Sequence, residues 1–130
     1  METIFTKIVK GEIPCYKIAE NDKFYAFLDI NPLAAGHTLV IPKEATDWLF
    51  DITDDDLSGI ILFAKKVAHA ISKTYPGKRV GMVVIGYEVP HAHIHLVPMQ
   101  TMQDIDFKRT RVKLSSEEFQ QIATAISRFI

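Results

Sequence analysis

The sequence has few of the features that mark several large classes of protein. It contains a single cysteine, Cys15, which excludes an internal disulfide and a zinc site built from several cysteines. No apolar run approaches the roughly 18 residues that a membrane-spanning helix needs. The first residues, METIFTKIVKGEIPC, lack the apolar centre of a signal peptide, so we expect a reducing, cytoplasmic location and no membrane partner.

An excess of charge of either sign is also missing. The chain has 15 basic and 16 acidic side chains and a formal net charge of -1, so it offers no surplus of cations for neutralising a phosphate backbone. We therefore expect no nucleic-acid partner. Repeats, linkers and low-complexity tracts are absent as well, and 130 residues with 48% hydrophobic side chains predict one domain over residues 1–130.

The hydrophobic pattern predicts an α+β fold with a five-stranded antiparallel sheet. At the start of the chain, Ile4, Phe5, Ile8 and Val9 have helical spacing, which predicts a short helix that buries these residues on one face. Gly11 is expected to end it. Short segments rich in aromatic and β-branched residues, separated by turn signals, predict strands at 16–21, 23–30, 37–42, 79–86 and 92–98.

Two further helices complete the predicted fold. The long central one is expected from the Thr53 cap to Pro76-Gly77, with Asp54, Asp55 and Asp56 at the positive end of its dipole. Its expected buried stripe is Leu57, Ile60, Ile61, Ala64, Val67, Ala68 and Ile71. Ser115 and Glu118 fit a capping box that starts a C-terminal helical extension over about 115–130.

The segment VPHAHIHLVP places three histidines at every second position. In a strand, His91, His93 and His95 share one side, with neighbours about 6.6 Å apart. The apolar residues between them then face the long helix, and Pro90 and Pro98 are expected to limit the strand. Three imidazoles on one face cost free energy to bury and gain little packing, which favours a chemical role.

Two kinds of chemistry fit these histidines. Histidines two residues apart can bind zinc, with Glu88 or Asp29 as a further ligand. Alternatively, a neutral imidazole whose Nδ1–H is held by a carbonyl directs the lone pair of Nε2 outward and can act as a nucleophile. His93, with a histidine on each side, is the natural candidate for that nucleophile.

Several motifs together resemble the histidine triad (HIT) superfamily, and within it the Hint branch of purine nucleoside phosphoramidases. HAHIHLV matches the triad pattern, while IFTKIVKGEIP, AFLDINP and GHTLVIPK match the amino-terminal signature of the family. The resemblance covers residues 3–99. Beyond residue 100 the match to the family is weaker.

The resemblance implies a nucleotide hydrolase that attacks the α-phosphate of an adenosine or other purine nucleotide and releases AMP. His93 matches the nucleophile that carries the nucleotide covalently, His95 a histidine that contacts phosphate oxygens, and His91 and His37 the pair that orients the nucleophile. Asp29 matches the carboxylate that binds the ribose hydroxyls. Base-packing positions are matched by Ile13, Phe27, Leu28, Ile30 and Leu39. The substrate would be a phosphoramidate or a dinucleoside polyphosphate, the protein a homodimer, and no metal or other cofactor would be required.

The sequence departs from the Hint branch just before the triad. The branch has a Gly-Gln-Ser type of loop there, whereas this chain has the shorter VVIGYEVPH, with Tyr87 and Glu88 after Gly86. A carboxylate repels phosphate oxygens, so Glu88 faces solvent, binds a basic leaving group or alters substrate choice. This leaves a nucleotide-binding regulator with little turnover as one alternative function, and a mononuclear zinc enzyme as another. Asp29 could also simply initiate a turn, and His69 has no predicted role.

Overall fold

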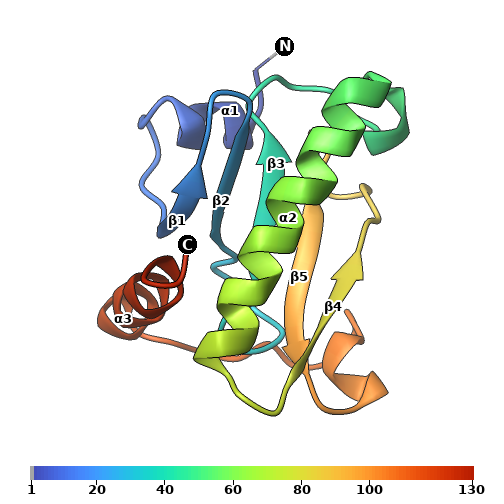
Figure 1. Ribbon diagram of the computed structural model, residues 1–130. Helices are drawn as coiled ribbons and strands as arrows, with labels where there is room; N and C mark the ends of the chain where they lie inside the picture. Colours follow the sequence, from blue (N-terminus) through green and yellow to red (C-terminus); the bar gives the residue numbers. More distant parts are fainter. Residues whose placement is uncertain (1) are drawn as a thin grey trace.

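The computed structural model describes residues 2–130 and confirms the predicted fold class. One antiparallel sheet has the spatial order β1-β2-β3-β5-β4, and the helices lie on its faces (Figure 1). The strands are β1 (Lys17–Glu20), β2 (Phe24–Leu28), β3 (Thr38–Pro42), β4 (Arg79–Val83) and β5 (Ile94–Met99). The helices are α1 (Ile4–Val9), α2 (Asp54–Thr74) and α3 (Ser116–Ser127), with 3₁₀ turns η1 (Leu49–Asp51) and η2 (Met102–Ile105).

Helix α2 crosses one face of the sheet, and its caps agree with the sequence (Figure 1). The Thr53 side chain accepts a hydrogen bond from the Asp56 N–H, which satisfies one of the free donors of the first turn. The buried stripe differs from the prediction. Ile61 is 40% exposed, because the buried face instead consists of Ile60, Phe63, Ala64, Val67, Ala70 and Ile71. The helix has more apolar side chains than its buried face can hold, so the hydrophobic pattern alone does not predict which of them are buried.

Strand β5 does not have the limits that its prolines predicted. It starts at Ile94, so His91 and His93 precede the first ladder pair, and it runs through Pro98 to Met99. On the β3 side the pairing stops at Leu96, which pairs with Thr38, while Pro98 pairs with Val80 of β4. Because the β3 ladder has ended before Pro98, a proline there removes no hydrogen bond to β3.

The opposite face of the sheet carries a smaller core beneath α1. Phe5 and Ile8 pack with Tyr25, Phe27, Leu39 and Ile41, whereas Ile4, predicted to be buried, is 49% exposed. The capping box of α1, in which Thr3 and Thr6 exchange side-chain and backbone hydrogen bonds, fixes how the amino terminus enters this face. The histidines lie on this side, whereas Ala92, Ile94 and Leu96 belong to the core on the α2 side, as predicted.

The turn between β2 and β3 depends on a glycine. Gly36 has a φ of +96°, and a Cβ added there would lie 2.6 Å from Cε2 of Tyr75, just after α2. Only glycine combines this backbone conformation with this close approach. The turn is thereby held against the end of α2, and it delivers His37 to the start of β3.

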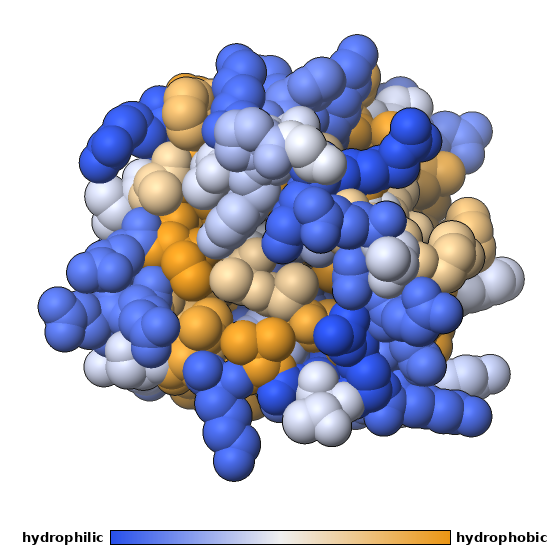
Figure 2. Space-filling model, turned by 90° about the horizontal axis from the view of Figure 1, so that it is seen from below, coloured by the Kyte–Doolittle hydropathy of each residue, from blue (hydrophilic) through white to orange (hydrophobic). Residues whose placement is uncertain are grey.

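The C-terminal part of the chain returns along the lower end of the molecule, as drawn in Figure 1, before α3 packs beside β1. The capping box of Ser115 and Glu118 begins α3 as predicted, and Ser127 donates to the carbonyl of Ile18. From this lower end, hydrophobic side chains are seen gathered inside a hydrophilic surround (Figure 2). Within residues 2–130, none of the helices has the length and apolar character needed to cross a bilayer.

Candidate active site

The three histidines of the segment 91–95 lie together on the α1 side of the sheet. The Phe5 ring contacts the rings of His91 and His93 edge to face, at centroid distances of 5.5 and 5.2 Å. The rings of His93 and His95 are 4.9 Å apart. All are largely buried, and His91 is fully buried. The sequence therefore predicted their common side correctly, although only His95 belongs to the strand.

The orientation of His93 is fixed by the backbone of the preceding histidine. Its Nδ1 lies 2.7 Å from the carbonyl oxygen of His91, and because a carbonyl can only accept, Nδ1 carries the proton. The neutral ring then keeps its lone pair on Nε2. His93 lines both hollows described below, and its Nε2 has no protein partner among the described residues. A buried imidazole with a free, directed lone pair is suited to nucleophilic attack.

The His91 ring supports this arrangement without facing the hollows. Its Nε2 lies 2.7 Å from the Pro42 carbonyl oxygen and therefore carries the proton, which leaves Nδ1 to accept a hydrogen bond from the Thr3 hydroxyl at 2.8 Å. Both ring nitrogens are satisfied, and the ring links the end of β3 to the cap of α1. Thr3 and Phe5, which position this histidine, were not singled out by the sequence, because a cap and a core aromatic look ordinary there.

His37 and His95 form a directional chain of hydrogen bonds. The Leu33 N–H donates to Nδ1 of His37 at 3.0 Å, so the His37 proton lies on Nε2. That Nε2 lies 3.0 Å from Nδ1 of His95, which must accept, and the proton of His95 is left on its Nε2. His95 therefore presents an N–H donor to the hollows, next to the free lone pair of His93.

Asp29 lies beside this chain and has two roles in the geometry. Its Oδ1 accepts from the Asn31 N–H at 2.8 Å, so it does initiate the turn, and its Oδ2 is 3.5 Å from Nε2 of His37. It also lines both hollows. Burial raises its pKa, opposed by the Asn31 N–H and by the positive charge of Arg111.

Ligand atoms of Asp29, His37 and His95 lie within 4.8 Å of one another, which is close enough to test for a metal site. Zinc requires a lone pair on each nitrogen. Nδ1 of His37 already accepts from the Leu33 N–H, so Nε2 holds the proton and has no lone pair to offer. The residues therefore form a hydrogen-bond relay and do not fit a divalent cation in this tautomeric state.

Burial keeps the histidines around His93 neutral. Desolvation lowers the pKa of His37 to about 3 and that of His95 to about 4, and a neighbouring histidine and Arg111 act in the same direction. The pKa of His91 is also lowered, mainly by burial, although its hydrogen bond to Pro42 opposes the shift. The hydrogen bonds above are consistent with this, because each ring nitrogen that accepts must be unprotonated.

An apolar hollow of about 210 Å³ opens beside His93 and His95. It brings together all the residues expected to pack a base, namely Ile13, Phe27, Leu28, Ile30 and Leu39, with Asp29 at its edge. They contribute differently. The side chains of Phe27 and Leu39 belong to the core beneath α1, whereas that of Leu28 packs on the α2 side and Ile30 is 73% exposed.

A second hollow, of about 220 Å³, shares Asp29, Glu88, His93 and His95 with the first. Its other walls are Ile85, Gly86, Tyr87, Phe107 and Arg111. Phe107 packs edge to face on the His95 ring, at a centroid distance of 4.8 Å. Sequence reasoning missed Phe107 and Arg111, which follow the predicted core region 3–99. No sequence signal singled out Arg111, because Lys108, Arg109 and Lys113 are cations of the same segment.

Tyr87 and Glu88, which stand where the Hint branch has its phosphate-binding loop, form the rim of this hollow. Tyr87 is 95% exposed, and Glu88 is exposed as well. Glu88 therefore faces solvent, one of the outcomes that the sequence left open. Water around an exposed carboxylate screens its charge, which weakens its repulsion of a bound phosphate.

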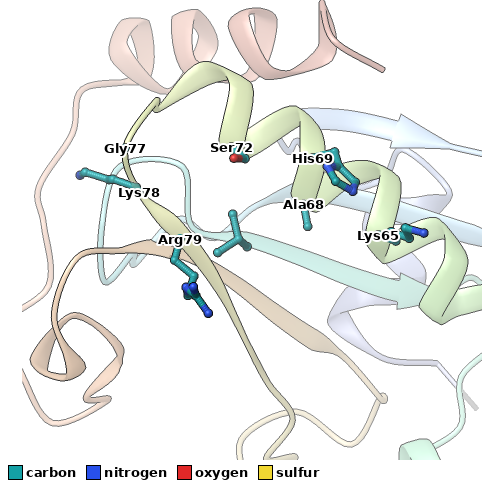
Figure 3. Close-up of a pocket in the computed structure, with 8 residues that line it drawn as sticks. Lys65, Ala68, His69, Ser72, Gly77, Lys78 and Arg79 are labelled. Carbon is teal, nitrogen blue, oxygen red and sulfur yellow. The ribbon is translucent and has the colours of Figure 1, made fainter.

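A more voluminous hollow, of about 480 Å³, lies far from this chemistry, between α2 and β4. It is lined by Lys65, Ala68, His69, Ser72, Gly77, Lys78, Arg79 and Val80. Figure 3 shows that the cationic groups of Lys65, Lys78 and Arg79 point in different directions rather than toward one centre. We therefore place the candidate active site at the histidines, where polar groups converge on shared space.

A relay of buried neutral histidines beside an apolar hollow is the arrangement of a histidine triad protein, and comparison with known proteins agrees. The family model for the HIT domain matches residues 10–102, which is most of the chain. The chain belongs to the HIT family.

Similar proteins cover from three quarters to nearly all of the chain. An uncharacterised HIT-like protein of Borreliella burgdorferi is 37% identical over 97% of this chain and 96% of its own length. The adenosine 5′-monophosphoramidase hnt1 of Schizosaccharomyces pombe is 41% identical over 75% of this chain and 74% of its own. Among solved structures, a HIT-like protein of Bartonella henselae superimposes with a TM-score of 0.85 and 28% identity, covering 99% and 96% of the two chains.

We expect the buried histidines to make the free energy of unfolding depend on pH below about 6.5, down to the lowered pKa values of about 4 for His95 and about 3 for His37. Their pKa values in the folded state lie below the ordinary 6.5, so the unfolded chain binds more protons in this range. Their contribution to stability is complete well above pH 6.5 and is lost as the pH falls towards the lowered values. Urea unfolding at several pH values measures this slope. His95→Gln should make it shallower, and an unchanged slope in that variant would contradict the assignment.

Proposed function

We propose that the protein hydrolyses purine nucleotides at the α-phosphate and releases AMP, through a covalent nucleotidyl intermediate on His93. The observation that carries the proposal is the free Nε2 lone pair of His93 beside the His95 N–H donor. Relatives named adenosine 5′-monophosphoramidase, 39–44% identical over most of the chain, support the choice of AMP as product.

The first step forms one bond at phosphorus and breaks another. Nε2 of His93 attacks the α-phosphorus, and the bond from phosphorus to the leaving nitrogen or oxygen breaks with its electron pair on the leaving group. The leaving group then takes up a proton. His95 is placed to donate its Nε2–H to a phosphate oxygen as negative charge redistributes in the transition state.

The second step restores the enzyme. Water attacks the same phosphorus, the bond from phosphorus to Nε2 of His93 breaks, and the ring regains its lone pair while AMP and a proton leave. Because the His91 carbonyl holds Nδ1–H throughout, the ring stays oriented in both steps. Splitting the displacement in two replaces one difficult step by two easier ones.

This chemistry assigns no role to a metal ion, in agreement with the hydrogen bonds at His37. The attacking group is a nitrogen lone pair, and the charge on phosphate is met by N–H donors. We therefore propose that no cofactor is needed, and the activity assay below includes a chelator to test this.

We expect His93→Ala to abolish turnover of an adenosine 5′-phosphoramidate and to remove the covalent adduct. The substitution deletes the nucleophile. Mass spectrometry of protein mixed with substrate in the presence of a chelator should show an added AMP on the unsubstituted protein and none on His93→Ala. His69→Ala, in the hollow between α2 and β4, is the matched control and should retain both activity and adduct. An adduct that survives His93→Ala, or wild-type activity lost to the chelator, would contradict the mechanism.

We propose that Asp29 binds the ribose hydroxyls, because its carboxylate lines both hollows, with Oδ1 held by the Asn31 N–H and Oδ2 3.5 Å from Nε2 of His37. Hydrogen bonds to a charged acceptor contribute about 1.5–3 kcal/mol, so Asp29→Asn should weaken AMP binding roughly tenfold or more. Calorimetry with AMP and 2′,3′-dideoxy-AMP separates this from a loss of fold. The variant should bind both nucleotides similarly. A preference for AMP as large as that of the wild type would refute the role.

We propose a homodimer joined through β4. This strand pairs on one side only, with β5, and Met82 within it and Val84 and Ile85 just after it are exposed. An unpaired apolar edge is covered when a second copy adds its own edge strand. We expect light scattering to give twice the 14.7 kDa mass of one chain, and Val84→Glu to give the monomer mass. Trp48→Glu, also exposed but on η1's flank, should leave the mass unchanged.

A further inference from the structure

The charges around the two hollows are out of balance for a phosphate ligand. The acidic and basic side chains that line them are Asp29, Glu88, His93, His95 and Arg111. Asp29 and Glu88 are acidic, and burial holds His95 neutral by lowering its pKa. A nucleotide adds further negative charge. Among the described residues that line either hollow, Arg111 is the only lysine or arginine.

Arg111 is held in place before any ligand binds. One terminal nitrogen donates to the Asn31 carbonyl at 2.7 Å and the other to the Phe107 carbonyl at 3.3 Å. Its guanidinium carbon lies 5.5 Å from the centre of the Phe107 ring. The Val112 N–H also donates to the Pro32 carbonyl at 2.9 Å, so this segment is tied to the turn that carries Asp29.

A guanidinium has five N–H donors in a planar fork. Hydrogen bonds to two carbonyls leave others free for a ligand, and the contacts with Phe107 reduce the conformational entropy lost on binding. The positive charge of Arg111 acts on the site. It acts to lower the pKa of Asp29, against the larger opposite effect of burial, and it adds to the lowering of the pKa of His95.

The two hollows differ in which residues they contain. The apolar one holds the residues expected to pack a base, and His93 and His95 belong to both. A phosphorus in contact with His93 therefore lies where the hollows meet. Arg111, Phe107 and Tyr87 line only the second hollow. With the nucleoside in the apolar hollow, the second hollow is free to hold the leaving group, which is attached to the other side of the phosphorus.

We propose that Arg111 binds an oxyanion on the leaving group, and that the protein prefers nucleotides whose α-phosphate carries a phosphate or sulfate over those that carry a neutral amine. This inference rests on the proposed function and specifies its substrate class. The guanidinium pairs with the tetrahedral oxyanion beyond the bridging oxygen and stabilises the charge that this oxygen gains as its bond to phosphorus breaks. For ADP, the products are AMP and inorganic phosphate, with one water consumed.

The test compares substrates with the same AMP part and different leaving groups. ADP and adenosine 5′-phosphosulfate carry oxyanions, and AMP morpholidate carries a neutral amine. For Arg111→Gln we expect kcat/KM to fall roughly 10- to 100-fold with the oxyanion substrates, the loss typical of a charge-assisted hydrogen bond, and less than about threefold with the morpholidate. The relative losses for ADP and the phosphosulfate identify which oxyanion is preferred.

Two variants serve as controls for folding and for general charge. Arg109→Gln removes a cation two residues away that pairs with Asp104 and lines neither hollow, so it should change all three substrates little. Arg111→Lys keeps the charge and loses the planar fork, and we expect an intermediate loss with the oxyanion substrates only. Equal losses of Arg111→Gln on all three substrates would overturn the proposal.

A binding measurement separates this inference from the proposed function. In protein carrying His93→Ala, which cannot turn over, ADP should bind more tightly than AMP, and adding Arg111→Gln should remove the difference. If the wild type hydrolyses none of the substrates, the proposed function fails, and this binding difference still decides the role of Arg111. Equal affinity of the His93→Ala protein for ADP and AMP would refute it.

Discussion

The site depends on one hydrogen bond that leaves no choice of tautomer. A carbonyl cannot donate, so the His91 oxygen forces the proton of His93 onto Nδ1 and leaves a lone pair on Nε2. The residues that contact the two rings hold the His91 backbone, and with it this oxygen, in place. Thr3 and Pro42 hold the His91 ring from two sides, and Phe5 packs on both imidazoles. The cap of the first helix and the end of a strand thereby become part of the reactive geometry.

Burial and hydrogen bonding act in the same direction on the remaining histidines. Removal from water disfavours the charged imidazolium, and each fixed donor, such as the Leu33 N–H, needs an unprotonated nitrogen to bind. The result is a set of neutral rings with a defined direction of donation, from Leu33 through His37 to His95. Such a set presents a lone pair on His93 and an N–H donor on His95, the two groups that the proposed mechanism uses. It leaves the negative charge of a phosphate to be balanced from elsewhere in the chain.

Much of this was visible in the sequence, for reasons that can be named. Alternation along a strand put the triad on one side, and local signals such as the Thr53 and Ser115 caps located α2 and α3. The stripe of α2 was harder, because Ile61 and Phe63 are equally apolar and only packing decides which is buried. The ends of a strand depend on which neighbouring strands it pairs with, and a local pattern does not show this. Pro98 therefore lies inside β5, paired with Val80, although the sequence predicted a boundary there. Arg111 reaches the site through tertiary contacts with Asn31 and Phe107, which no local pattern encodes.

The segment that carries Phe107 and Arg111 follows the region, residues 10–102, that defines the family. It is fastened to the turn of Asp29 by a main-chain hydrogen bond from Val112 to Pro32 and by the Arg111 side chain, which donates to the Asn31 carbonyl. Because other residues hold the triad imidazoles, proteins that share the triad can differ in this segment while the imidazoles stay as they are. Differences in specificity within such a group would then depend mainly on a segment outside the family domain. Shortening the chain to residues 10–102 would remove Arg111 together with Phe107, two of the nine residues that line the second hollow.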